Sequence, residues 1–151
     1  MEKSMEKRTT IIATIATIAV ILLLSINPVV ARADTPDDYG NTFSDASIWD
    51  PIHESAANSK NAAIDYSKDV DMFKFTAAAS GTYTFSTGNL APTIVYLDLY
   101  LYNSSYGLIS GKLANNNQTV SFNCSLNSGQ TYYLKADGYM GTGAYTVNIS
   151  G

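Results

Sequence analysis

Two acidic clusters hold the side chains of this chain that are best suited to chemistry. Asp37 and Asp38 stand close to Asn41, and Asp69 and Asp71 stand just before a segment of alternating apolar residues. Calcium takes about six to eight oxygen ligands from carboxylates, amide carbonyls and backbone carbonyls. If the first cluster folds onto the second, the two together can complete such a shell. The alternative stays open, because Asp and Asn are common turn formers whose side chains are often simply solvated.

The sequence offers little for catalysis. Its one histidine, His53, lies in the irregular stretch DPIHES. There is no G-x-S-x-G elbow, no H-E-x-x-H helix and no second histidine for a zinc site. Aspartate pairs can in principle hydrolyse glycosides. Acids that share a cation are held in their ionised forms, however, and are poor proton donors. We expect that the protein is not an enzyme and that His53 is a surface or packing residue.

Eleven tyrosines are many for a chain of this size. In the strand predicted over residues 94–102, alternate leucines take the core face, so the intervening tyrosines take the other face. Tyrosine offers a rigid apolar ring with a polar tip, which suits sugars or peptides as ligands. Outward aromatics can equally stabilise cross-strand pairs or be covered by the N-terminal segment. The candidate ligand-binding residues are Tyr96, Tyr100, Tyr102, Tyr133 and, in a predicted Gly-rich loop, Tyr139.

The elements that must position these residues begin after a predicted leader. Residues 1–33 have the layout of a secretory signal peptide: a basic start, an uncharged run over residues 9–26, and the pattern Ala31-Arg32-Ala33 before a cleavage point at Asp34. The alternative is an uncleaved anchor, because the apolar run approaches the ~18 residues of a spanning helix. Cleavage is favoured, and the protein is expected to be secreted and extracellular.

The charge of the exported part restricts its partners. The leader holds four of the nine basic residues and two of the thirteen acidic ones, which leaves five basic against eleven acidic residues, a net charge of −6. Nucleic acid and anionic membrane surfaces both require a basic face, so neither is expected as a partner. The single cysteine, Cys124, cannot form an internal disulfide. It alternates with Phe122 and Leu126, which predicts a buried small side chain on an inward strand face rather than a reactive thiol.

The rest of the chain has the two-residue period of β-strands. Short alternating segments recur with turn residues between them, and no long amphipathic helix is indicated. We predict one all-β domain, an antiparallel β-sandwich of about eight strands. The predicted organisation is a signal peptide over 1–33, an acidic N-terminal segment over 34–60 that packs on the sandwich, and the β-sandwich domain over 61–151. The predicted strands cover residues 62–64, 71–76, 82–86, 94–102, 108–109, 120–126, 131–136 and 144–150.

Four segments in this order resemble the bacterial pre-peptidase C-terminal domain family, which is related to the collagen-binding domains of clostridial collagenases. They are DDYGNTFSDA at 37–46, AAIDYSKDVDMFKFTAAASGTYTF at 62–85, LDLYLYNSSYGLIS at 97–110 and LNSGQTYYLKADGYMGTGAYTVNIS at 126–150. The resemblance implies a jelly-roll-like sandwich of the kind found at the ends of secreted proteases. In the family this domain generally trails a catalytic domain, whereas here only the predicted leader precedes it.

The resemblance also implies a calcium ion that ties the N-terminal segment to the sandwich. Matching residue for residue, the implied ligands are Asp37, Asp38, Asp69 and Asp71, with Asn41 as a weaker choice and Asp65 or Ser67 as extras. Family members often have a glutamate where this chain has Thr35 and Pro36. The absence of that glutamate here would weaken calcium binding. In the collagen-binding relatives an aromatic surface contacts the ligand. Lys135 stands where a second outward aromatic would extend that surface, which argues against collagen as the ligand.

These observations predict a secreted, non-catalytic and calcium-stabilised β-sandwich module, expected to be a monomer. Its expected partner is an extracellular polymer, either protein or carbohydrate, or an exported hydrolase that it accompanies. The alternative is a structural or export-assisting module that has no dedicated ligand.

Overall fold

The computed structural model describes residues 37–49, 52 and 58–151. The predicted signal peptide and His53 lie outside the described residues. The described part contains nine strands and no helix, and it therefore offers no helix that is long and apolar enough to span a membrane. The strands are β1 (Ser47–Ile48), β2 (Asn58–Ile64), β3 (Val70–Thr76), β4 (Gly81–Gly88), β5 (Tyr96–Asn103), β6 (Leu108–Lys112), β7 (Ser121–Leu126), β8 (Thr131–Met140) and β9 (Gly143–Ser150).

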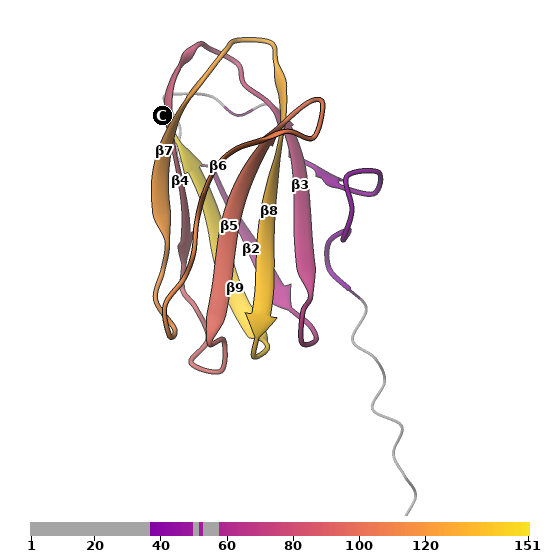
Figure 1. Ribbon diagram of the computed structural model, residues 1–151, viewed down its shortest axis with the longest axis vertical. Helices are drawn as coiled ribbons and strands as arrows, with labels where there is room; N and C mark the ends of the chain where they lie inside the picture. Colours follow the sequence, from indigo (N-terminus) through magenta and orange to yellow (C-terminus); the bar gives the residue numbers. More distant parts are fainter. Residues whose placement is uncertain (1–36, 50–51, 53–57) are drawn as a thin grey trace, which may run out of the picture. The chain divides into compact units, whose positions relative to one another are not determined.

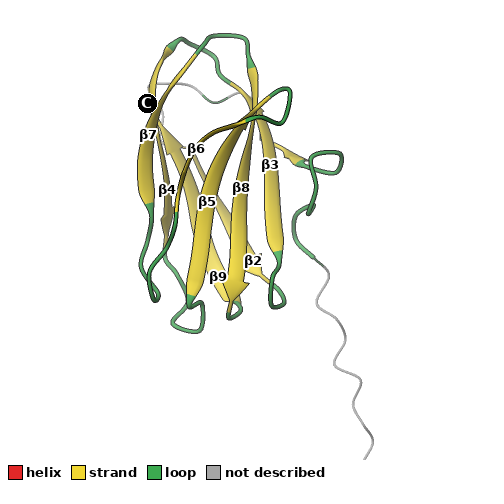
Figure 2. Cartoon of the chain, in the orientation of Figure 1, coloured by secondary structure: helices red, strands yellow, loops and turns green. Residues whose placement is uncertain are grey.

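The strands form two sheets that pack face to face, as Figures 1 and 2 show. The five-stranded sheet has the order β1-β3-β8-β5-β6, and the four-stranded sheet has the order β2-β9-β4-β7. Every pairing between strands is antiparallel except that of β1 with β3, which is parallel. The predicted all-β sandwich is confirmed. Strand β1 was not predicted, because its two residues are too few to show an alternating pattern.

Alternation of side chains along the strands builds the core between the two sheets. In β5 the leucines at 97, 99 and 101 are fully buried, while the alternate residues Tyr96, Asp98, Tyr100 and Tyr102 face away from the core. Phe75 of one sheet meets Phe85 of the other with ring centroids 6.0 Å apart. Burial of such side chains stabilises the fold by about 1.5–3 kcal/mol each. The apolar core therefore fixes the two sheets against each other, and with them the polar side chains that the sheet edges carry.

The segment before β2 is attached to the edge of the five-stranded sheet. Trp49 donates its backbone N–H to the carbonyl of Lys74 at 2.7 Å, and Met72 donates to the carbonyl of Gly40 at 2.8 Å. Trp49 itself is buried and packs edge-on against Phe73. Strand β2 begins at Asn58, inside the segment that the sequence analysis assigned to the region before the sandwich.

Cys124 lies on the inner side of β7, next to the core, but it is only half buried. Its inward position was predicted from the alternation of β7, but the side chain is less buried than we expected. Its exposure follows from the position of β7 at the edge of the four-stranded sheet. The partial burial raises the pKa of the Cys124 thiol, so the side chain is more protonated and less nucleophilic than an ordinary exposed cysteine.

Candidate functional site

The acidic residues of the two clusters meet at the edge of the sandwich. One set of carboxylate oxygens comes from Asp37, Asp69 and Asp71, and a second set comes from Asp37, Asp38 and Asp65. Within each set the oxygens lie within 4.8 Å of one another. The structure therefore brings together the four aspartates selected from the sequence, and it places Asp65, which the sequence offered as an extra, beside Asp37 and Asp38. They come from three segments: the N-terminal segment, the connection between β2 and β3, and β3 itself.

A tight connection between β2 and β3 fixes Asp69. Its Oδ2 accepts the backbone N–H of Asp65 at 2.7 Å, and its Oδ1 accepts that of Val70 at 2.8 Å. Lys68 adopts the left-handed conformation with φ of 69°, and its N–H donates to the carbonyl of Gly138 in β8. Such hydrogen bonds between an aspartate and nearby backbone groups are typical of turns. The carboxylate is therefore held in one place by the chain around it.

The N-terminal segment is joined to this connection through side chains. Asp38 accepts the backbone N–H of Ala63 at 2.9 Å. The amide nitrogen of Asn41 donates to Asp37 at 2.5 Å and to the hydroxyl of Tyr66 at 2.8 Å, while its oxygen accepts the N–H of Val70 at 3.1 Å. Asn41 thus lies at the cluster, as the sequence indicated, but its contacts are those of a residue that positions Asp37.

Burial makes the electrostatics of the cluster unusual. Asp69 and Asp71 are both fully buried. Oδ2 of Asp71 accepts the hydroxyl of Tyr145 at 2.6 Å, but its buried Oδ1 has no hydrogen-bond partner among the described residues. The pKa of Asp71 is raised to about 8, mainly by loss of solvation and also by the charges of Asp38 and Asp69, against the lowering effect of the hydrogen bond from Tyr145. Burial likewise raises the pKa of Asp38 and of Asp69.

Among the described residues, no basic side chain forms an ion pair with this cluster. The one salt bridge within the described part of the chain joins Lys135 to Asp137, which are not members of the cluster. A buried polar atom without a partner costs about 1–3 kcal/mol, and more when it is charged. The donor set consists of oxygen atoms alone, and it includes one buried oxygen that needs a partner. These residues fit a hard divalent cation.

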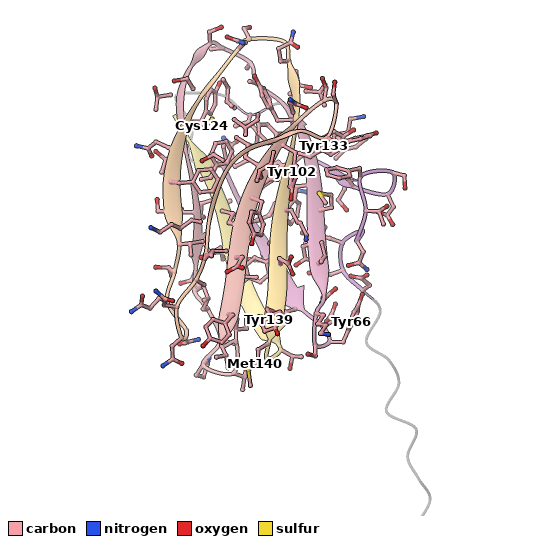
Figure 3. The ribbon with its side chains drawn as sticks, in the orientation of Figure 1. Tyr66, Tyr102, Cys124, Tyr133, Tyr139 and Met140 are labelled. Atoms are coloured by element: carbon pink, nitrogen blue, oxygen red, sulfur yellow. The ribbon has the colours of Figure 1, made fainter. Side chains whose placement is uncertain are left out.

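The aromatic face predicted from the sequence lies on the outer side of the five-stranded sheet, but part of it is covered. Phe43 of the N-terminal segment packs on Tyr102, Tyr106 and Tyr133, with ring centroids 5.2, 4.4 and 5.3 Å from its own. Tyr133, expected to be available for a ligand, is only 6% exposed. The expectation was wrong for this residue because the N-terminal segment lies over it. Figure 3 shows Tyr102 and Tyr133 close together toward one end of the sandwich.

Tyr96, Tyr100 and Tyr139 remain at least partly exposed. Tyr139 is 63% exposed and lies within β8 rather than in a loop, and its ring is 6.5 Å from that of Tyr96. Tyr100 is half buried, and its hydroxyl donates to Oδ2 of Asp98 at 3.1 Å. Loss of solvation and the neighbouring Asp98 raise the pKa of Tyr100 to about 12. Tyr100 therefore keeps its hydroxyl proton over the whole physiological range.

Comparison with known proteins supports the fold. No family model and no curated protein matches the sequence. The chain is similar to the pre-peptidase C-terminal domain of a collagenase from Bacillus anthracis, with a TM-score of 0.51 and 19% identity, and the match covers 70% of this chain and 96% of that one. It is also similar to a mitogen from Yersinia pseudotuberculosis, with a TM-score of 0.50 and 12% identity, covering 64% of this chain and 86% of that one.

A periplasmic inhibitor of g-type lysozyme from Aeromonas hydrophila matches with a TM-score of 0.45 and 10% identity, covering 70% of this chain and 97% of that one. At such identities the likeness concerns the fold alone. The resemblance that the sequence analysis stated is confirmed at the level of that fold, a β-sandwich shared with the collagenase domain.

Proposed function

We propose that this protein is a secreted, non-catalytic binding module that is stabilised by calcium and that holds an extracellular polymer on the outer face of its five-stranded sheet. The observation that carries the calcium part is the buried Oδ1 of Asp71, which has no hydrogen-bond partner in the part of the chain that the structure describes and belongs to a cluster of carboxylates. A cation at this point satisfies that oxygen and offsets the charges of its neighbours.

The chemistry of the donor set favours calcium over softer metals. All the clustered side chains are carboxylates, whereas zinc sites are built largely from histidine and cysteine. Asp37, Asp69 and Asp71 would hold the ion, with Asp38 and Asp65 beside them. Because Asp37 belongs to the N-terminal segment and Asp71 to β3, the ion would tie that segment to the sheet. Acids engaged in this way are not available as proton donors, which supports a non-catalytic role.

Export and leader cleavage are tested by determining the N-terminal residue of the secreted chain. When the protein is produced with its own leader in a bacterial host, we expect a culture-supernatant product that begins at Asp34, as Ala-x-Ala cleavage requires. Replacing the small residue before the cleavage point, Ala33→Phe, should retain the leader, and Arg32→Lys is the matched control. N-terminal sequencing and intact mass decide the result. A chain that stays in the membrane with its leader would contradict secretion.

Polymer binding is tested by co-sedimentation of the purified protein with insoluble collagen, chitin, cellulose and peptidoglycan. We expect the protein to pellet with one of these polymers and to remain soluble after Tyr100→Ala, because that ring is an accessible aromatic group on the outer face. Tyr106→Ala serves as the control, since its ring belongs to the group around Phe43. If no polymer retains the protein in calcium or in chelator, polymer binding is wrong for this panel and the structural-module reading takes its place.

A further inference from the structure

The open part of the outer face is organised around Tyr100. Lys135 of β8, Tyr100 of β5 and Gly111 of β6 are partners across the sheet. A Cβ atom at Gly111 would lie only 2.6 Å from Cδ1 of Tyr100 and 3.0 Å from the carbonyl oxygen of Leu99. The Tyr100 ring therefore occupies the space above the backbone of β6, and glycine is the residue that leaves room for it. The ring leans across the neighbouring strand as a platform.

Charged groups in fixed positions surround this platform. Asp98 is held by the backbone N–H of Ala114, which donates to its Oδ1 at 2.8 Å, and by the Tyr100 hydroxyl at its Oδ2. Asp137 is the cross-strand partner of Asp98, and Lys135 donates to it at 2.5 Å. The ammonium of Lys135 lies 5.8 Å from the centre of the Tyr100 ring. The side chains of Lys135 and Asp137 remain 24% and 29% exposed, so a ligand can reach both.

We propose that Tyr100 with Asp98, Lys135 and Asp137 is the seat for one sugar unit of a polysaccharide that is neutral or carries amino groups. This inference rests on the proposed function, because it names the class of polymer that the module binds. A pyranose ring has an apolar C–H face that stacks on an aromatic ring, and its rim of hydroxyls both donates and accepts hydrogen bonds. The two carboxylates accept from such hydroxyls, and the ammonium donates to them.

Two features favour a sugar over a peptide, and a third restricts the charge of the polymer. Strand β5 is paired on both sides, with β8 and with β6, so a peptide cannot add a strand there. The seat offers one ring among charged groups rather than an apolar pocket for a side chain. Two carboxylates against one ammonium, on a chain with a formal net charge of −4, disfavour acidic polymers. Tyr102 and Tyr133 are not part of the seat, because Phe43 covers them.

The test is titration of the purified protein with soluble hexasaccharides of glucose, N-acetylglucosamine and glucosamine, with polygalacturonate, and with a triple-helical collagen peptide. Binding is followed by calorimetry. We expect one of the neutral or amino hexasaccharides to bind, with at least about a tenfold loss of affinity in Tyr100→Ala. Lys135→Met, which keeps the length of the side chain but removes its donors, should also weaken binding, whereas Tyr106→Ala should not. Thermal unfolding of each variant checks that it is folded.

The other outcomes show whether the sugar assignment, the site or the proposed polymer binding is wrong. If only the collagen peptide binds and the Tyr100→Ala variant loses it, the module binds a polymer but the sugar assignment is overturned. If a hexasaccharide binds equally to wild type, Tyr100→Ala and Lys135→Met, the polysaccharide class stands but the seat is wrong. Preference for polygalacturonate overturns the charge argument and the inference with it. If nothing in this panel or in the co-sedimentation panel binds, the inference and the proposed polymer binding both fail.

Discussion

Chelation of calcium is expected to lower the free energy of unfolding of this protein by about 2.7 kcal/mol, if the ion is present at about a hundred times its dissociation constant. The reason is the fully buried pair Asp69 and Asp71, whose charges meet no basic side chain in the cluster. The corresponding loss in melting temperature is roughly 10 °C or more for a domain of this size. Thermal unfolding in calcium chloride and in EGTA measures it.

Asp71→Asn is the variant that isolates the site. It removes the charge of Asp71 but keeps its size, so calcium should no longer stabilise the protein. Asp137→Asn is the matched control, because Asp137 pairs with Lys135 outside the cluster, and it should retain the full response to calcium. Equal melting temperatures for the wild-type protein in calcium and in EGTA would show that the cluster is not a calcium site.

The pH dependence gives the same experiment a second readout. Without a cation, burial raises the pKa of Asp71 from 3.8 to about 8, so the folded protein binds this proton more tightly than the unfolded chain. The stabilisation by this proton is therefore complete below about pH 4 and is lost as the pH rises toward 8, by at most about 1.4 kcal/mol per pH unit. In EGTA, stability should fall from pH 5 to pH 9, and this fall should be smaller in Asp71→Asn. The benefit of calcium should grow over the same range.

A single methyl group at Gly40 is expected to abolish high-affinity calcium binding while leaving the sandwich folded. A Cβ atom there would overlap the carbonyl group of Asp45, which belongs to the same turn of the N-terminal segment. The carbonyl of Gly40 also accepts the N–H of Met72, next to Asp71. In Gly40→Ala the turn must shift, and it carries Asp37 and Asp38 away from the acids of β3. We expect at least a hundredfold weaker calcium binding in a competition assay with a fluorescent chelator.

The control is Gly129→Ala. Gly129 has a φ of 74°, so alanine there is strained, but a Cβ atom would meet nothing within 4 Å. We expect a loss of about 1 kcal/mol in stability with unchanged calcium affinity. Circular dichroism should report the same strand content for both variants. If Gly40→Ala binds calcium like the wild-type protein, the N-terminal segment does not supply ligands to the ion.

Sequence alone predicted strands such as β4 and β5 well because buried side chains alternate with more exposed ones along them. The alternation in β5 separates its leucines from its tyrosines without ambiguity, and burial then fixes the register. The acids of the site were found for a different reason. They cluster in the sequence as oxygen donors and match the ligand positions that the family resemblance implies, whereas the burial of Asp69 and Asp71 was not predicted.

The sequence left open that the N-terminal segment covers outward aromatic residues, but it did not identify which residues make these long-range contacts. Phe43 lies among polar residues with no periodicity, so nothing local showed that it would cover Tyr133. The same holds for the hydrogen bond between Tyr145 and Asp71, which joins residues of two sheets. The one available signal was an aromatic residue in an otherwise polar segment. It indicates that the segment packs against another part of the protein, but it does not identify that part.

The N-terminal segment also affects whether the edge of the sandwich can pair with another copy of the same chain. Strand β2 ends its sheet, and an edge strand with free N–H and C=O groups can pair with another chain and begin aggregation. Here Asp38 accepts the N–H of Ala63, and the hydroxyl of Tyr39 donates to the carbonyl of Asn61. Side chains take hydrogen-bonding positions on β2 that a foreign strand would need. Docking of the N-terminal segment thus protects this edge of the sandwich against pairing with a second copy of the chain.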